Sequence, residues 1–436
     1  MSYKKEEHMK ESKTTTQKLI LGLQHVLAMF GATVLVPALT GLNTSITLFC
    51  AGVGTLIFHA VTKRKVPVFL GSSFAFMGGI IAIIGDSRMG DPDYLDKLAA
   101  VKGALIVAGL VYVVFSVIIK MVGYEKVNKI LPPVVTGPII IVIGLRLSSS
   151  GINNALFLDG AFSIKCMIVT IVVLATVIGF SVFAKGIFNL MPILFGIIAG
   201  FIVCTPLGFT NFDAVTNADW IAFTDKEIMK QVLCMPVFRP DAILALAPIA
   251  LVTMIEHVGD ITTNGAVVGQ NFFKDPGVHR TMLGDGLATM FAGLVGGPAN
   301  TTYGENTGVL AVTKNYDPSI IRIAACFAIV LGIFGKIGGV ITSIPTPVSG
   351  AISIVLYGMI SAVGARILIN TRLNLGNSRN LMITALILVV GIGCDSIPVT
   401  ETVTISGLAI AAVIGIVLAL VLPEGVDCYL PEKGEK

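Results

Sequence analysis

The stretch "PANTTYGENTGV", from Pro298 to Val309, decides the fold of this chain because it interrupts two long apolar runs. It holds a glutamate, two asparagines, a tyrosine and three threonines behind a proline, which breaks a helix. Irregular backbone at membrane depth is tolerated only where it is buried in protein or lines a cavity. The stretch therefore predicts an interrupted span that faces an internal polar site.

The composition around this stretch is typical of a helical membrane protein. Hydrophobic residues make up 54% of the 436 residues and charged residues only 13%, which is too little charge to cover a soluble domain. Apolar runs of roughly 20 residues predict an all-α polytopic membrane protein with about fourteen transmembrane segments. The polar first residues predict no cleavable signal peptide. The seven cysteines have no paired spacing, so we expect reduced packing residues, with no cofactor and no bound metal.

Basic residues gather in the short connections that fall on one side of the predicted membrane. The positive-inside rule makes that side cytoplasmic and places both termini there. The acidic loop from Asp86 to Asp96 and the long loop from about Pro206 to Pro240 are then extracellular. The basic residues are Lys63, Arg64, Lys65, Lys120, Lys126, Lys129, Lys274, Arg280, Arg366, Arg372 and Arg379.

Three short segments of the first half recur in the same order in the second half. They are "QHV" (24–26) with "EHV" (256–258), "VPVFLGSSF" (66–74) with "GPANTTYG" (297–304), and "PVVTGPI" (133–139) with "PVSGAI" (347–352). A repeat of seven spans is odd-numbered, so the second copy enters the membrane from the opposite face. Inverted repeats of this kind are typical of secondary carriers, whose site lies at the midplane between the copies.

Two segments in corresponding positions are interrupted spans. "KVPVFLGSSFAFMGG" and "GGPANTTYGENTGV" each open with a proline, continue with residues that favour extended backbone, and reach a glycine before the apolar run resumes. We expect a short strand followed by a half-helix, whose unpaired N–H groups and positive dipole end face a polar ligand. The alternative, a pair of surface turns, finds little room among the loops.

Three carboxylates fall inside apolar surroundings. Glu256 and Asp260 are four residues apart and share one helix face, and Glu305 lies in the second interrupted span. Such groups are costly in a bilayer and are paired, protonated or functional. Two carboxylates in one low-dielectric site cannot both ionise cheaply, so we expect proton exchange together with recognition of a neutral heterocycle. The alternative is a set of helix-packing polar groups, and we favour this alternative for His257.

The motifs that carry these residues resemble a known family. "QHVLAMFGATVLVP", "VPVFLGSSFAF", "EHVGD", "DPGVHRTMLGDGLAT" and "NTTYGENTGV" are similar to the nucleobase–ascorbate (nucleobase:cation symporter-2) transporters, and most similar to the bacterial uracil carriers among them. The resemblance covers roughly Gln17 to Leu422.

The resemblance implies a fold of fourteen spans in two inverted repeats of seven, with short antiparallel strands in spans 3 and 10. Spans 1–4 (18–122) and 8–11 (241–337) would form a core domain. Spans 5–7 (123–206) and 12–14 (338–422) would form a gate domain. Residues 207–240 would be an extracellular loop, and 1–17 and 423–436 would be cytoplasmic tails. Members tend to form homodimers.

The resemblance also implies roles for individual residues. Glu256 and Glu305 would bind the pyrimidine ring, while the proton would be carried by Asp260, with Glu256 as the alternative carrier. The uracil carriers resemble "EHVGH", so the aspartate at position 260 is a departure from their pattern. The remaining implied residues are Phe74 and Gly304 through their backbone, Ser73 and Tyr303 lining the site, Tyr357 facing it from the gate, and His25 supporting it.

The resemblance implies a proton-coupled symporter that imports uracil across the cell membrane. A carboxylate at position 305 accepts a ring N–H, whereas purine and ascorbate carriers tend to hold a glutamine there. A xanthine or purine permease is the alternative within the family, and Na⁺ is the alternative coupling ion. A SulP-like anion carrier is disfavoured by the two glutamates, and an enzyme by the absence of HExxH or GxSxG motifs. We expect uracil, protons and lipid as partners, and no nucleic acid.

Overall fold

The computed structural model describes residues 14–123, 132–186, 188–394, 396–398, 404–423, 425 and 428–429. Most of residues 1–17 and 423–436, expected as cytoplasmic tails, lie outside these residues, as do Lys126 and Lys129. The described chain is mostly helical, which confirms the predicted class. Seven of its helices are long and apolar enough to cross a membrane, and four further apolar helices are shorter. The chain is thus a multi-pass membrane protein.

The first half of the chain contains two groups of helices on either side of residue 123. The elements of the first half are α1 (Thr15–Thr40), α2 (Thr44–Val61), β1 (Leu70–Ser72), α3 (Met77–Ile84), α4 (Tyr94–Val122), α6 (Pro133–Leu156), β2 (Phe157–Leu158), β3 (Ala161–Phe162), α7 (Ile164–Val182), η1 (Phe188–Leu190) and α8 (Pro192–Leu207). Their helices begin at residues that favour a start: Thr14 forms a capping box with Gln17, and the Asn43 side chain accepts from the Ile46 N–H.

A long connection with three short helices joins the halves. It holds α9 (Asp213–Asn217), η2 (Ala222–Thr224) and α10 (Lys226–Leu233). The second half follows with α11 (Pro240–Leu246), α12 (Ile249–Val268), η3 (Phe273–Gly277), α13 (Val278–Val295), β4 (Asn300–Thr302), α14 (Gly304–Thr313), α15 (Pro318–Ile333), α16 (Gly335–Thr342), α17 (Thr346–Asn370), α18 (Ser378–Gly393), β5 (Ser396–Pro398), β6 (Thr404–Ser406) and α19 (Gly407–Val421).

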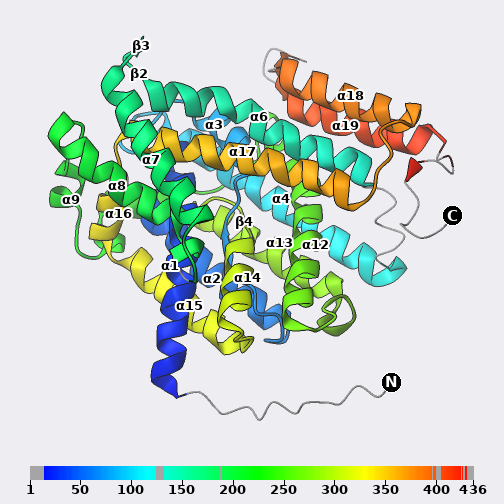
Figure 1. Ribbon diagram of the computed structural model, residues 1–436, viewed down its shortest axis with the longest axis horizontal. Helices are drawn as coiled ribbons and strands as arrows, with labels where there is room; N and C mark the ends of the chain where they lie inside the picture. Colours follow the sequence, from blue (N-terminus) through cyan, green and yellow to red (C-terminus); the bar gives the residue numbers. More distant parts are fainter. Residues whose placement is uncertain are drawn as a thin grey trace.

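The helices pack in two bodies that draw on both halves of the chain (Figure 1). In the lower body of the view, α2 lies against α13 and α15, and α4 lies against α13. In the upper body, α6 lies along α17, with α7 and α8 at one end and α18 and α19 at the other. The two long helices α6 and α17 approach closely because glycines line their contact: a Cβ at Gly364 would come within 2.6 Å of the Gly137 carbonyl oxygen.

Two short strands from opposite halves pair at the centre of the lower body. Strands β1 and β4 are antiparallel, with Leu70 opposite Thr302 and Ser72 opposite Asn300. All six strand residues are buried. Side chains of the flanking helices satisfy their backbone, since the Thr55 hydroxyl on α2 accepts from the Leu70 N–H at 2.9 Å and Thr289 on α13 donates to the Asn300 carbonyl at 3.0 Å. This pair fixes where α3 and α14 begin.

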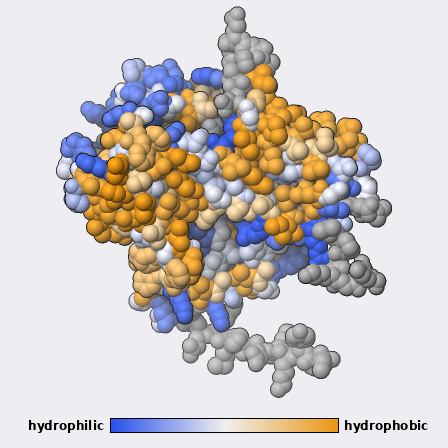
Figure 2. Space-filling view, turned by 45° about the horizontal axis from the view of Figure 1, so that its top comes forward, coloured by the Kyte–Doolittle hydropathy of each residue, from blue (hydrophilic) through white to orange (hydrophobic). Residues whose placement is uncertain are grey.

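Broad hydrophobic areas cover the visible face of the molecule (Figure 2). They arise because long apolar side chains point outward from the helices instead of into a core, as Leu110, Val114 and Val117 do on α4 and Val413 and Val417 do on α19. Patches of this extent are far larger than those a soluble monomer exposes. They are consistent with a lipid-facing surface.

Two lysines hold the long connection between α8 and α11 onto the lower body. Lys102 on α4 is completely buried, and its ammonium donates to the carbonyls of Gln231, Val232 and Cys234 at the end of α10, at 3.0, 3.1 and 2.5 Å. Lys336 on α16 donates in the same way to two carbonyls at the end of α9, at 2.8 and 3.0 Å. A cation at a helix C-terminus satisfies orphan carbonyls and complements the dipole.

Replacing Lys102 with methionine is expected to lower the apparent Tm of the purified protein by about 5 °C. The reason is that three carbonyls lose a charged donor in a site that water does not reach, at a cost of about 3 kcal/mol. Thermal unfolding in detergent measures the shift. Lys230→Met is the matched control on α10, because it removes only the exposed pair with Glu227 (2.7 Å), which contributes less than about 1 kcal/mol. Equal shifts in both variants would contradict the assignment.

An ion pair joins the start of α1 to the start of α15. Lys18 Nζ lies 2.8 Å from the Asp317 carboxylate, and Asp317 also accepts from the Ser319 N–H. Partial burial alone would raise the pKa of Asp317, but these hydrogen bonds outweigh it and hold the pKa at about 2. A depressed carboxyl pKa stabilises the fold above the unfolded pKa and loses that effect as the pH falls.

We therefore expect the Tm difference between the wild type and Asp317→Asn to be largest above about pH 5, to halve near pH 3, and to nearly vanish near pH 2. Since the Asp317 side chain is 40% exposed, its contribution is below about 1 kcal/mol. Thermal unfolding across this pH series measures it. A difference that stays constant with pH would show that the Lys18–Asp317 pair does not titrate as described.

Candidate functional site

The antiparallel pair of β1 and β4 brings two helix N-termini into one region. Helix α3 follows β1 after a short turn, and α14 begins directly after Tyr303. Neither N-terminus has a side-chain cap, so each leaves backbone N–H groups for another partner. A Cβ at Gly304 would meet no atom within 4 Å, which shows that the N-terminus of α14 borders open space.

Three carboxylates converge at this place. Glu256 and Asp260 lie on α12, Glu305 lies in the first turn of α14, and α12 packs against both β4 and α14. The three are close enough for the charge of one to act on another. The face of α12 that carries Glu256 is open, because a Cβ at Gly259 would meet nothing within 4 Å. The structure thus brings together the acidic residues singled out from the sequence.

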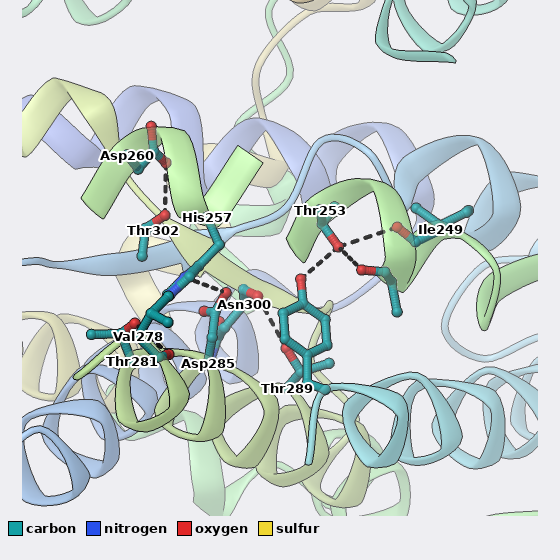
Figure 3. Close-up of polar contacts among 12 residues, drawn as sticks. Ile249, Thr253, His257, Asp260, Val278, Thr281, Asp285, Thr289, Asn300 and Thr302 are labelled. Carbon is teal, nitrogen blue, oxygen red and sulfur yellow. Dashed lines mark hydrogen bonds and ion pairs between the residues drawn. The ribbon is translucent and has the colours of Figure 1, made fainter. Parts of the chain in front are cut away.

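Asp260 is tied to the strand pair. Its carboxylate accepts a hydrogen bond of 2.6 Å from the Thr302 hydroxyl on β4 (Figure 3). Thr302 is buried and stands opposite Leu70 in the pairing. A change in the charge of Asp260 therefore alters a hydrogen bond to the strand pair that positions α3 and α14. Thr302 was not among the residues predicted for the site.

The other predicted site residues surround this region in different ways. Tyr303 is buried, packs its ring over Gly71 and donates its hydroxyl to the Ser72 carbonyl at 2.9 Å. Ser73 is completely buried, and its hydroxyl has no hydrogen-bond partner among the described residues. Phe74 is half-buried, where the cores of both bodies meet.

Tyr357 on α17 lies on the opposite side of the seam between the two bodies. It is 2% exposed and packs with Val36 of α1 and Met77 of α3. The side chain therefore reaches the core from the upper body, where its ring packs among apolar groups and its hydroxyl lies within hydrogen-bonding reach of Ser353.

His25 is held by a residue that the sequence analysis did not identify. The Asn306 amide donates to His25 Nδ1 at 3.1 Å and to the His25 carbonyl at 3.0 Å. This arrangement makes Nδ1 the acceptor, so the ring proton lies on Nε2 and the imidazole is a neutral donor. Asn306 directly follows Glu305. Its place next to a predicted substrate-binding residue is the signal that could have identified it.

A second polar contact lies behind Glu256. His257 and Asp285 are both completely buried, and Nδ1 of His257 lies 3.1 Å from the Asp285 carboxylate on α13 (Figure 3). We interpreted His257 as a packing residue, and Asp285 was not singled out. The signal for Asp285 was its place in the apolar run after "DPGVHRTMLG", where a lone carboxylate requires a partner.

The arrangement can bind a small, flat, neutral polar molecule. It combines carboxylate acceptors from two elements with backbone donors from a helix N-terminus, beside open space. Such a mixture matches the alternating N–H and C=O edge of a heterocyclic base. The same carboxylates can take up and release a proton.

The chain is similar to proteins of known name over nearly its whole length. It is 44% identical over 412 residues to the "Uracil permease" of Bacillus caldolyticus, covering 94% of this chain and 93% of that protein. It is 42% identical to the "Uracil permease" of Bacillus subtilis, covering 92% of each, and 36% identical to that of Escherichia coli K12, covering 93% and 91%.

The fold is similar to solved structures of anion transporters. The transmembrane domain of the cyanobacterial bicarbonate transporter BicA matches with a TM-score of 0.61 at 14% identity, covering 93% of this chain and 97% of that domain. Murine Slc26a9 in the inward-facing state matches with a TM-score of 0.67 at 8% identity, covering 94% of this chain and 68% of that one. At these identities the likeness concerns the fold alone.

The family model described as "Permease family" (Xan_ur_permease) matches residues 16–400. This match covers most of the chain, and the relatives named above agree with it, so the resemblance seen in the motifs is confirmed. The chain belongs to this permease family, the nucleobase:cation symporter-2 family, and is a multi-pass transport protein rather than an enzyme.

Proposed function

We propose that this protein imports uracil across the cell membrane in symport with a proton. The observation that carries the proposal is the convergence of Glu256 and Glu305 beside the uncapped N-terminus of α14. The uracil permeases that the chain resembles support the choice of substrate. The acidic lining argues against an anion as the substrate, although the fold is shared with anion transporters.

Recognition follows from the hydrogen-bonding pattern of the uracil ring. Its ring N–H groups donate to the carboxylates of Glu256 and Glu305, and its carbonyl oxygens accept from backbone N–H groups at Phe74 and Gly304. His25, Ser73, Tyr303 and Tyr357 complete the site as supporting groups. A hydrogen bond to an ionised carboxylate contributes about 1.5–3 kcal/mol and one to a neutral carboxyl about 0.5–1.5 kcal/mol, so the two glutamates contribute a large share of the affinity of such a small ligand even when one of them holds a proton.

Proton coupling rests on Asp260 in this proposal, and Glu256 and His25 are the further residues that we assign to it. Asp260 lies within electrostatic reach of Glu256 and bonds to the strand pair through Thr302. Protonation of Asp260 removes a negative charge next to the ligand and changes its bond to Thr302. Binding of uracil and binding of a proton are then linked thermodynamically.

We further propose fourteen membrane crossings in two inverted repeats of seven. Support comes from the packing contacts, which occur in pairs: each contact has a second one in which both helices are replaced by their counterparts in the other repeat. These pairs are α4 with α13 and α15 with α2, α7 with α8 and α18 with α19, α17 with α7 and α6 with α18, and α3 with α1 and α14 with α12. The interrupted spans 3 and 10 contain the paired strands β1 and β4.

The core domain comprises 18–122 and 241–337, and the gate domain 123–206 and 338–422; the boundary between core and gate in the second half falls inside α16. Residues 207–240 are extracellular and both tails cytoplasmic, following the basic connections. We also propose that the protein forms a homodimer, as the family resemblance implies. Native mass spectrometry in detergent tests the oligomeric state.

Competition for labelled uracil uptake tests the function. Right-side-out vesicles containing the protein are given a lower pH outside than inside, and each unlabelled nucleobase is added in turn. We expect uptake to require the pH gradient, to be independent of Na⁺, and to be reduced by unlabelled uracil. Reduction by xanthine alone, or uptake that follows a Na⁺ gradient at constant pH, would overturn the substrate or the coupling ion, respectively.

A further inference from the structure

The helix that carries Glu256 and Asp260 is fixed to the core by polar contacts along one face. Thr253, His257 and Asn264 on α12 are spaced by four and seven residues, so they share a face. Thr253 accepts from the Tyr112 hydroxyl at 2.5 Å, and Asn264 donates to the Pro67 carbonyl at 3.1 Å. His257 lies between these two anchors and contacts Asp285 (Figure 3).

We propose that His257 and Asp285 form a positioning pair that sets the direction in which Glu256 faces. This inference rests on the proposed function and adds a role for two residues that do not touch the ligand. Neighbouring helix residues point about 100° apart. Fixing the His257 side chain against α13 therefore fixes the rotation of α12 that turns Glu256 toward the open face of the helix.

The contact between His257 and Asp285 lies away from bulk solvent. Both side chains are 0% exposed, and the imidazole also meets the edge of the Phe58 ring at a centroid distance of 6.3 Å. His257 Nδ1 lies 3.1 Å from the Asp285 carboxylate, close enough for the two side chains to interact directly. Apolar side chains of similar volume would fill this space at less cost in desolvation, so packing alone does not account for the pair.

The pair also controls the charge next to Glu256. Asp285 is close enough to Glu256 for its charge to act on that carboxylate. Within the pair, the Asp285 carboxylate has a polar partner in His257 Nδ1. If His257 is removed, either Asp285 repels the Glu256 carboxylate or it must hold a proton itself. In both cases the electrostatic surroundings of the Glu256 carboxylate, which accepts from the ligand, change although no residue that contacts the ligand has been replaced.

Equilibrium binding of labelled uracil to the purified full chain in detergent tests the pair. The variants are His257→Gln, Asp285→Asn and the double variant, with the apparent Tm of each ligand-free protein measured alongside. We expect each single variant to raise the Kd at least about tenfold. In the double variant an amide–amide hydrogen bond replaces the pair, and we expect the Kd to return to within about threefold of the wild type.

Thr281→Val is the matched control. Thr281 is buried one turn before Asp285 on α13, and within the described part of the chain its hydroxyl bonds only to the Val278 carbonyl of its own helix. We expect its Kd to equal that of the wild type. If this control raises the Kd as much as Asp285→Asn does, general disturbance of α13 explains the result and the proposal fails.

Two other outcomes also overturn the positioning role. One is a wild-type Kd in either single variant. The other is a double variant whose loss equals the product of the two single losses, because residues that act as a pair are non-additive. If one single variant cannot be purified in folded form, the remaining single and the double variant decide. Failure of the proposed function gives a different result, because the wild type itself would then not bind uracil. In that case all variants are measured with the nucleobase that the wild type does bind.

Discussion

Glu305→Gln is expected to reduce uracil uptake about 100-fold. Glutamine keeps the size of the side chain but offers a neutral oxygen and an N–H₂ donor in place of a charged acceptor. The ring N–H of uracil loses a charge-assisted bond, and one of its edges meets a donor instead. A loss of about 2–3 kcal/mol corresponds to a factor of 30 to 150.

Initial rates of labelled uracil uptake and equilibrium binding measure this effect together. Glu227→Gln is the control, because Glu227 is a glutamate on α10 that pairs with Lys230 at the surface. We expect the control to behave as the wild type. If Glu305→Gln binds uracil with an unchanged Kd, Glu305 does not contact the ring. A gain of xanthine uptake in this variant would support the role of this position in choosing between bases.

Asp260→Asn is expected to abolish uracil accumulation driven by a pH gradient while sparing exchange. Asparagine has nearly the same shape, and its oxygen can still accept the hydrogen bond from Thr302. It cannot take up a proton at any physiological pH. The strand pair and the substrate site should therefore stay intact while the coupling is lost.

Two assays on the same proteoliposomes separate these effects. Counterflow with equal pH on both sides should remain within about threefold of the wild type, and accumulation under an inward pH gradient should fall to the level of empty liposomes. Thr302→Val is a useful companion, because it removes the hydrogen bond but leaves the carboxylate able to titrate. If Asp260→Asn still accumulates uracil on the pH gradient alone, the proton is carried by another group, and Glu256 becomes the candidate.

The long connection between α8 and α11 illustrates how far sequence patterns reach. Its length and polarity predicted a loop, and the structure shows three short helices there, two of them fixed at their ends by Lys102 and Lys336. Lys336 donates to carbonyls at the end of α9. Its acceptors are carbonyls more than a hundred residues away, and no local pattern connects a lysine with the end of a distant helix.

The membrane class, the interrupted segments and the acidic residues could all be predicted from the sequence. The reason is that a bilayer imposes strong local rules: apolar runs of a certain length, prolines that break helices, and carboxylates that are too costly to place without a purpose. These rules act on a few residues at a time, so they can be recognised along the chain. The family motifs are local in the same sense.

Which polar groups meet became visible only in the folded chain. Asp260 with Thr302, His25 with Asn306 and His257 with Asp285 each join different helices or a helix and a strand. The spacing along one helix states which side a residue faces, but not which element lies opposite. That depends on the pairing of β1 with β4 and on the packing of α12 against α13, which are long-range contacts selected by the whole core together.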